Sequence, residues 1–119
     1  MARRRNRISR SGDFDAVYRR GTSAVGRHLV VYAVDREDGR PARLGLSVSK
    51  KVGGAVERNR IKRVLREQFA SLDPGPPDGA DVVVIARPSV ATYLDENGSE
   101  AIGERLASLV EDATRAMTA

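Results

Sequence analysis

The sequence predicts an α+β fold, a single-domain sandwich of a small mixed sheet with helices. Three stretches are expected to be strands. Arg27–Asp35 is rich in β-branched and aromatic residues, Arg43–Ser49 alternates apolar with small or polar residues, and Asp81–Ala86 is a continuous apolar run. Three others repeat apolar residues at helical spacing, starting at Ser11, near Val56 and at Ser99. A chain of 119 residues suffices for one modest core, so we expect residues 1–119 to form one domain. The expected order is α-β-β-(β)-α-β-α, in which the bracketed strand is optional.

Residues 1–10 form a strongly basic N-terminal arm. They include five arginines and a single possible apolar anchor, Ile8. A segment of this composition is disordered by default, and binding a polyanion is its commonest function.

The first helix is expected between Ser11, which can cap it, and Gly21, which stops it. Phe14, Val17 and Tyr18 recur at i, i+3 and i+4 and therefore share one face. An aromatic pair on a helix face is more often part of a core than a binding surface. The residues alone therefore favour a packing role.

The next two strands are expected to pair as a hairpin. The segment between them, Arg36–Arg40, carries the turn dipeptide Asp38-Gly39. The first strand, Arg27–Asp35, is apolar enough for both of its faces to be covered.

The return strand alternates between two different faces. One face is apolar and carries Leu44, Leu46 and Val48. The other face is small and polar, as the floor under an RNA strand would need, and carries Gly45, Ser47 and Ser49. Tyr32 either shares this second face or is buried, and both alternatives stay open.

A helix with a cationic ridge is expected near Val56, after Gly53-Gly54. Its apolar residues form one stripe: Ile61, Val64, Leu65, Phe69 and Leu72. From Arg58 to Arg66 the chain has five cations and no acid. Like charges this close repel one another, so a polyanion partner is favoured over a merely solvated face.

Charge divides the chain into two halves. Residues 1–66 carry 18 cations and 6 acids, a balance of +12, whereas residues 67–119 carry 3 cations and 10 acids, a balance of −7. The basic half would attract a nucleic acid and the acidic half would turn away from it. No stretch is long and apolar enough to span a membrane, and the absence of cysteine suits a reducing cytoplasm.

The sequence patterns of the C-terminal half predict structural packing and no functional site. Asp81–Ala86 is a continuous apolar run, typical of a buried parallel strand. Residues 89–98 are ambiguous, with a turn marked by Asn97-Gly98. Ser99 is expected to cap a last helix with one apolar and one acidic face.

The residues offer no catalytic or metal-binding set. His28 is the single histidine and opens a strand, where a structural role is favoured. The acids of 35–38 and 95–100 lie in a turn and at a helix start, where acids are ordinary. We therefore expect RNA binding without cleavage by side chains of this chain.

Residues 47–66, SVSKKVGGAVERNRIKRVLR, resemble the signature of the protein subunit of bacterial ribonuclease P. The match includes the Arg-Asn-Arg core at 58–60 and the Ser-Lys-Lys lead-in at 49–51. Size and element order agree from about Asn6 to Ala86.

The resemblance implies a ribosomal-protein-S5-domain-2-like fold with a left-handed βαβ crossover, although general rules favour the right hand. It also implies a subunit of an endoribonuclease that removes the 5′ leader of precursor tRNA. In that enzyme the RNA subunit, with bound Mg²⁺, performs the hydrolysis. The implied partners are this catalytic RNA and precursor tRNA, without DNA or a membrane.

The resemblance also assigns roles to residues. Contacts with the catalytic RNA are implied for Lys50, Lys51, Arg58, Asn59, Arg60, Lys62, Arg63 and Arg66. A cleft for the single-stranded leader is implied at Phe14, Tyr18 and Tyr32, which reverses the packing role favoured above. Asn6 and Arg7 are implied as further RNA contacts.

Two other functions remain as alternatives. A structural RNA-binding protein of ribosomal type would explain the divided charge equally well, but not an aromatic cleft. A helix-turn-helix DNA-binding protein could use residues 56–70 as its recognition helix, yet a strand and Gly-Gly precede that segment where a partner helix is needed.

Overall fold

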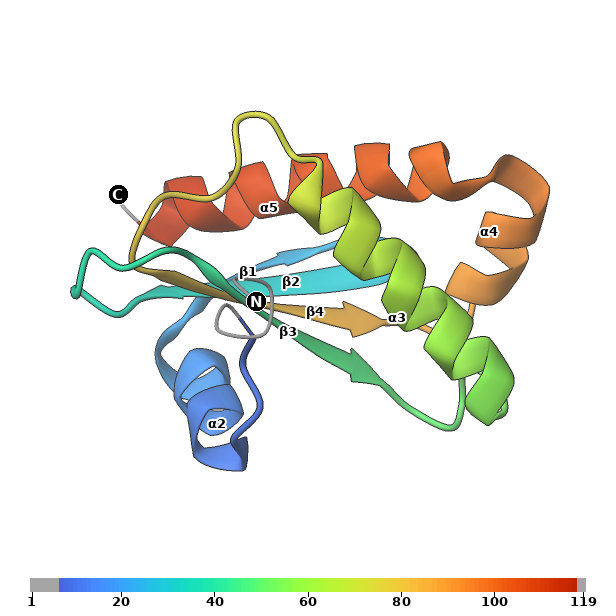
Figure 1. Ribbon diagram of the computed structural model, residues 1–119, viewed down its shortest axis with the longest axis horizontal. Coiled ribbons are helices and arrows are strands. Elements are labelled where there is room, and N and C mark those ends of the chain that lie inside the picture. The colour runs from blue at the N-terminus through green and yellow to red at the C-terminus, as the bar shows by residue number, and fades with distance from the viewer. Residues whose placement is uncertain (1–6, 118–119) are drawn as a thin grey trace.

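The computed structural model describes residues 7–117, which form one four-stranded sheet between helices (Figure 1). In chain order the elements are α2 (Ser11–Arg20), β1 (Thr22–Val25), β2 (Leu29–Asp35), β3 (Arg43–Val48), α3 (Ala55–Ala70), β4 (Ala80–Ala86), α4 (Val90–Asn97) and α5 (Ser99–Met117). Helices α3 and α5 cover one face of the sheet, and α2 packs on the other. The predicted α+β sandwich is confirmed.

Strand β4 lies inside the sheet, whose order is β1-β2-β4-β3. It pairs in parallel with β3 and antiparallel with β2. Its valines, Val82, Val83 and Val84, are fully buried, as the continuous apolar run predicted. The predicted hairpin is wrong, because β4 separates β2 from β3. The Asp38-Gly39 turn helps to reverse the chain, but it does not choose the neighbour with which a strand forms hydrogen bonds.

A buried ion pair fixes the register of β3 on β4. Asp81, at the start of β4, is only 4% exposed and lies directly opposite Arg43 of β3. Arg43 donates from Nε and Nη2 to the two carboxylate oxygens at 2.8 and 2.7 Å, and Arg36 donates to the same carboxylate. Because a slip of β3 along β4 would remove the two Arg43 hydrogen bonds from this buried carboxylate, the contact favours the observed register.

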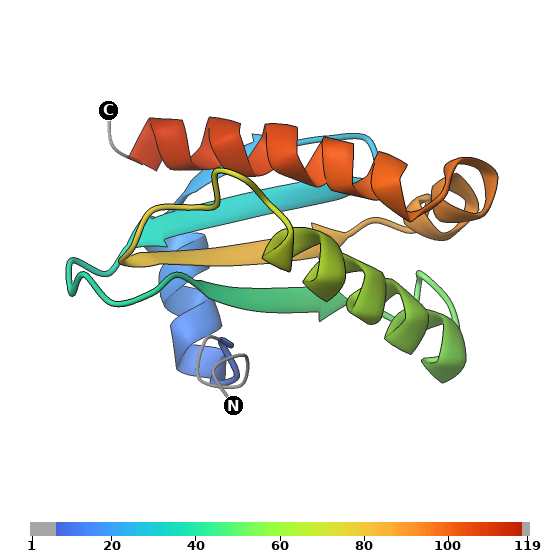
Figure 2. The same cartoon turned by 45° about the horizontal axis from the view of Figure 1, so that its top comes forward.

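The connection β3–α3–β4 is left-handed. In Figure 2 both strands run to the right, α3 lies in front of the sheet and β3 lies below β4. A right-handed connection would place β3 above β4 in this view. The fold therefore has the rare hand that the resemblance implied.

Helix α2 begins one residue earlier than a cap at Ser11 would allow. Arg10 occupies the N-cap position, so Ser11 is the first helical residue and the predicted cap is wrong. Gly21 ends the helix as predicted, and its N–H donates to the carbonyl of Val17 at 2.8 Å. Val17 is fully buried and packs with Ile8 and Val83 in a small second core on this face.

Two elements had no firm signal in the sequence. Strand β1 pairs antiparallel with β2 at the edge of the sheet and takes the place of the optional strand. Helix α4 lies within residues 89–98 and buries Val90 and Leu94. Within residues 7–117 no helix has the length and apolar character needed to cross a membrane.

Candidate nucleic-acid interface

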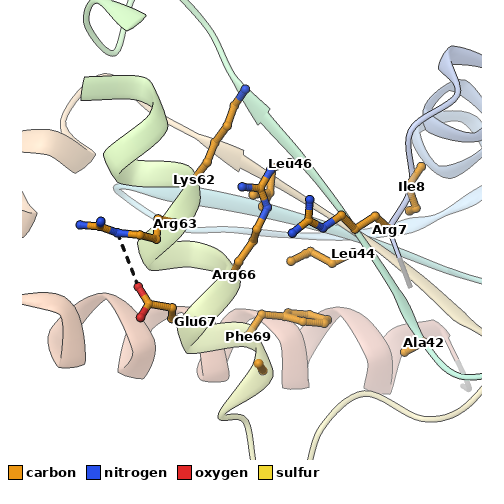
Figure 3. A pocket seen from close by; sticks show the side chains of 11 residues that line it. Arg7, Ile8, Ala42, Leu44, Leu46, Lys62, Arg63, Arg66, Glu67 and Phe69 are labelled. Carbon is orange, nitrogen blue, oxygen red and sulfur yellow. Dashed lines mark ion pairs between the residues drawn. The ribbon is translucent and has the colours of Figure 1, made fainter. Parts of the chain in front are cut away.

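Helix α3 is anchored to the core on one side and carries its cations at the surface. Ile61, Val64 and Leu65 are buried in the main core, as the apolar stripe predicted. Figure 3 shows that Arg66 points towards the N-terminal segment, whereas Arg63 points away from it, towards Glu67. The cations of α3 therefore divide between two sides of the helix.

The N-terminal segment runs along the free edge of β3, opposite α3. Arg7 forms a parallel bridge with Leu44, and the N–H of Ile8 donates to the Leu44 carbonyl at 2.9 Å. This pairing places the Arg7 side chain beside α3 (Figure 3). The implied RNA contact at Asn6 lies outside the described residues.

A groove of about 470 Å³ lies between α3 and this edge of the sheet. We call it the basic groove. Its apolar lining consists of Ile8, Ala42, Leu44, Leu46, Phe69 and Ala70. Its charged lining consists of Arg7, Lys62, Arg63, Arg66 and Glu67. Three of the residues implied for RNA binding on α3 thus line the same groove as one N-terminal cation.

Arg66 has an unfavourable electrostatic environment in the basic groove. Burial lowers the pKa of Arg66 from its ordinary value, and the nearby charge of Arg7 lowers it further. Within the described residues, Arg7, Lys62 and Arg66 have no acidic partner. Among residues 7–117, the acidic partner of Arg63 is Glu67, at 3.8 Å and with both side chains largely exposed. An anion bound between Arg7 and Arg66 would stabilise both.

Arg60 differs from these cations, because two acids of the protein hold it. Its guanidinium donates to Glu57 at 3.0 and 3.1 Å and to Asp95 of α4 at 2.6 Å. The hydrogen bonds with Glu57 and Asp95 raise the pKa of Arg60. Its RNA contact stays a prediction, and the structure adds a second role as the link between α3 and α4.

The other implied RNA contacts lie around the start of α3. Lys50 and Lys51 are exposed in the connection between β3 and α3, and Asn59 is exposed on the helix. Arg58 is partly buried there. No acid within the described residues pairs with Lys50, Lys51 or Arg58. These cations remain available to an anionic partner.

Phe14, Tyr18 and Tyr32 gather on the opposite face of the sheet. The rings of Phe14 and Tyr18 have centroids 6.4 Å apart, and the Tyr18 and Tyr32 rings meet edge to face at 5.2 Å. Tyr18 is 36% exposed, so the group keeps an open side. The three residues implied for the leader cleft are therefore in one place, which we call the aromatic cluster.

The small face of β3 lies under the aromatic cluster. A Cβ atom at Gly45 would come within 2.9 Å of the Phe14 ring, so the ring rests directly on the strand. Burial raises the pKa of the Tyr18 hydroxyl, while a hydrogen bond with Ser47 acts in the opposite direction. The predicted alternation of β3 is confirmed, with its small residues beneath the rings.

His28 has a packing role. Its Nδ1 lies 2.8 Å from Ser89 Oγ, and its ring stacks on Tyr93 with centroids 4.2 Å apart. Arg105 lies 5.4 Å from the centre of the Tyr93 ring. In the part of the chain that the structure describes, no three residues of types His, Cys, Asp or Glu are grouped as metal ligands.

Comparison with known proteins assigns this chain to a family. The sequence pattern of the family described as Ribonuclease P matches residues 2–112. The Ribonuclease P protein component of Brevibacillus brevis is 45% identical over 87 residues, which are 73% of this chain and 69% of that protein. The chain belongs to the ribonuclease P protein family.

Solved structures agree with the ribonuclease P assignment. A Staphylococcus aureus RNase P protein, a mutant described as defective in mRNA degradation activity, has a TM-score of 0.81 at 34% identity. The alignment covers 94% of this chain and 91% of that one. The RNase P protein of Thermotoga maritima has a TM-score of 0.77 at 28% identity, over 92% and 96% of the two chains. The resemblance is confirmed, and the chain is a protein subunit of the ribonuclease P holoenzyme.

Sequence reasoning about this ribonuclease P protein missed how its cations are partnered. Glu57 was visible one turn before Arg60, at a spacing that favours an ion pair. Asp95 had no such signal, because only the fold brings α4 to α3. The pairing of Arg7 with Leu44, and hence the basic groove, likewise depends on contacts remote in sequence.

Proposed function

We propose that this chain holds two RNA segments on opposite faces of one sheet and so assists removal of the 5′ leader from precursor tRNA. The catalytic RNA binds along α3 and the basic groove, through Lys50, Lys51, Arg58, Asn59, Arg60, Lys62, Arg63 and Arg66, with Arg7 and Asn6 from the N-terminal segment. The leader binds across the aromatic cluster of Phe14, Tyr18 and Tyr32.

The observation that carries this proposal is the alternation of β3. Leu44 and Leu46 line the basic groove, whereas Gly45 and Ser47 lie beneath the aromatic cluster. A single strand thus connects a phosphate-binding surface to a base-stacking surface. Arginine suits phosphate because its planar fork forms paired hydrogen bonds, and aromatic rings hold unpaired bases of any identity.

We assign the hydrolysis, and the Mg²⁺ that it requires, to the RNA subunit. Glu57 of α3 and Asp95 of α4 accept hydrogen bonds from Arg60. Asp81 accepts hydrogen bonds from Arg36 and Arg43. The engagement of these three acids by arginines, within the described residues, supports this assignment. The protein would act as one RNA-binding domain in the cytoplasm, for which the cysteine-free composition is support.

Reconstitution tests the proposal. The purified chain, a bacterial ribonuclease P RNA and a precursor tRNA with a labelled leader are combined at low Mg²⁺, and release of the leader is measured. We expect stimulation by the full mixture and no cleavage by the protein alone.

Two results would contradict the proposal. If the protein failed to stimulate the RNA, its role in tRNA processing would be contradicted. If RNA-free protein cleaved the substrate, the assignment of hydrolysis to the RNA subunit would be contradicted. Crosslinking from position 32 to the leader separates this role from that of a structural RNA-binding protein, which has no reason to contact a leader there.

A further inference from the structure

The basic groove has an apolar floor that phosphate binding does not require. A surface that only met the RNA backbone would need cations alone. Here Leu44, only 9% exposed, and the partly exposed Leu46 and Phe69 line the same hollow as the cations. The groove therefore offers an apolar surface next to charged groups.

We propose that the basic groove receives a single unstacked RNA nucleotide, with its base on the floor and its phosphate between Arg7 and Arg66. The inference rests on the proposed function in that the nucleotide would come from the catalytic RNA. It adds a specific subsite, distinct from the aromatic cluster on the other face of the sheet.

The size of the groove fits a nucleotide. Its volume of about 470 Å³ lies within the range of small-molecule pockets, roughly 300–1,000 Å³. Phe69 forms part of the lining at the C-terminal end of α3 (Figure 3). Aromatic rings and guanidinium planes are the two groups on which proteins most often stack unpaired bases. The groove has both, since Phe69 and the two arginines line it together.

The distribution of charge in the basic groove determines how a bound nucleotide would be oriented. Arg7 and Arg66 lie at the side of the groove towards the N-terminal segment, and neither has an acidic partner within residues 7–117. Glu67 lines the groove farther from Arg7 than Arg66 does, and it is paired with Arg63 (Figure 3). A phosphate would be attracted towards Arg7 and Arg66 and repelled by Glu67. The base is thereby directed along the apolar floor.

The charge also distinguishes RNA from an apolar peptide as the occupant. An apolar peptide segment would cover Leu44, Leu46 and Phe69 but would leave the repulsion between Arg7 and Arg66 unrelieved. A phosphate alone would relieve that repulsion but would leave the floor exposed. A nucleotide satisfies both, because it joins an apolar, stackable base to an anion by one ribose.

Titration with three small probes, followed by NMR of the full chain, tests the subsite. The probes are AMP, ribose 5-phosphate and inorganic phosphate. We expect all three to shift the Arg7 and Arg66 side-chain signals, and only AMP to shift the methyl signals of Leu44 and Leu46. Equal shifts from all three, or none from AMP, would overturn the proposal.

A filled groove provides the matched variant. Ala70 is an exposed residue of the lining, so Ala70→Trp would occupy the hollow without removing a cation. Ala107→Trp, at an exposed position of α5, is the control. We expect Ala70→Trp to weaken AMP binding at least about fivefold, the loss of roughly one stacking contact, and to leave inorganic phosphate binding unchanged. Phe69→Leu, which keeps the floor apolar, should weaken AMP in the same selective way.

The catalytic RNA gives the decisive readout. Ala70→Trp should weaken its binding at least about fivefold relative to Ala107→Trp, while the dependence on salt keeps its slope because no phosphate contact is lost. Unchanged affinity would overturn the use of the groove by this RNA. A failure of the proposed function would look different, since the wild-type chain would then not stimulate leader release whatever the probes show.

Discussion

The guanidinium of Arg60 donates to the carboxylate of Asp95 at 2.6 Å and joins α3 to α4. Glu57 accepts two further hydrogen bonds from the same group. Arg66, nearly two turns later on the same helix, has no acidic partner within the described residues. Two arginines of one basic helix therefore differ in how much charge they can offer to an RNA.

This difference predicts unequal effects of the same substitution. A plot of the log affinity for the catalytic RNA against log salt has a negative slope. Arg66→Ala should make this slope shallower by about 0.7–0.9, the share of one phosphate contact. Arg60→Ala should change the slope less, because Glu57 and Asp95 already neutralise Arg60. Binding measured over a series of salt concentrations checks both variants. Equal losses of slope would show that the RNA displaces the two acids.

The Arg60 contacts should contribute little to stability. The Arg60 and Asp95 side chains are 35% and 63% exposed, so Asp95→Asn should lower the free energy of unfolding by less than about 1 kcal/mol. Urea denaturation of the isolated protein measures this change. A loss of several kcal/mol would contradict an exposed, solvent-screened pair.

Gly45 should be required for the aromatic cluster. A Cβ atom there would lie 2.9 Å from the Phe14 ring and 3.1 Å from Ile8 Cβ, so Gly45→Ala must displace the ring. We expect a loss of about 1–3 kcal/mol in the free energy of unfolding, together with weaker binding of leader-bearing tRNA. Gly12→Ala in α2, where an added Cβ meets no atom within 4 Å, is the control. Similar behaviour of the two variants would show that Phe14 does not need the strand surface.

Tyr32 should affect only substrates that carry a leader. Tyr32→Leu removes the ring and keeps an apolar side chain, so the preference of the holoenzyme for precursor over mature tRNA should fall by at least about fivefold, as loss of one base stack implies. Tyr93→Leu removes an aromatic ring from α4 and should leave the preference unchanged. The affinities of the two tRNAs for each holoenzyme give the ratio. An unchanged ratio for Tyr32→Leu would place the leader elsewhere.

His28 should make the protein less stable in mild acid. Burial first, and then the charges of Arg105 and Arg27, lower the pKa of His28 below its usual 6.5. The unfolded chain therefore takes up the proton more readily than the folded chain. The stabilisation is complete above pH 6.5 and is lost as the pH falls through the lower folded pKa.

Comparison with His28→Gln isolates this effect, because the chain has no other histidine. The free energy of unfolding of the wild type should fall more steeply than that of the variant between about pH 7 and pH 5. Urea titrations at several pH values provide the curves. Parallel curves would contradict a lowered pKa.

The sequence predicted best where a pattern reports burial directly. The run from Asp81 to Ala86 predicted the burial of β4, which is parallel to β3 but antiparallel to β2. The stripe of Ile61, Val64 and Leu65 predicted the anchored side of α3. Both patterns depend on which side chains are buried, and hydrophobic periodicity reports burial directly.

Prediction was weaker where the outcome depends on remote residues. Asp38-Gly39 is a strong local turn signal, yet the neighbour of β2 is β4, which lies more than forty residues away. The partner of Arg60 on α4 and the position of Arg7 beside Leu44 likewise depend on tertiary contacts. The handedness of the β3–α3–β4 connection is not encoded by any local pattern either. It was predicted correctly because the family resemblance implied it.

The insertion of β4 between β2 and β3 has a consequence for synthesis at the ribosome. A nascent chain that has reached residue 79 contains three of the four strands but lacks the one that joins them. Until Ala80–Ala86 emerges, β2 and β3 have no shared partner, and the basic helix has no complete sheet to cover. Tertiary folding is therefore delayed until Ala80–Ala86 has emerged, and a ribosome stalled before that point would carry an RNA-attracting but unfolded segment.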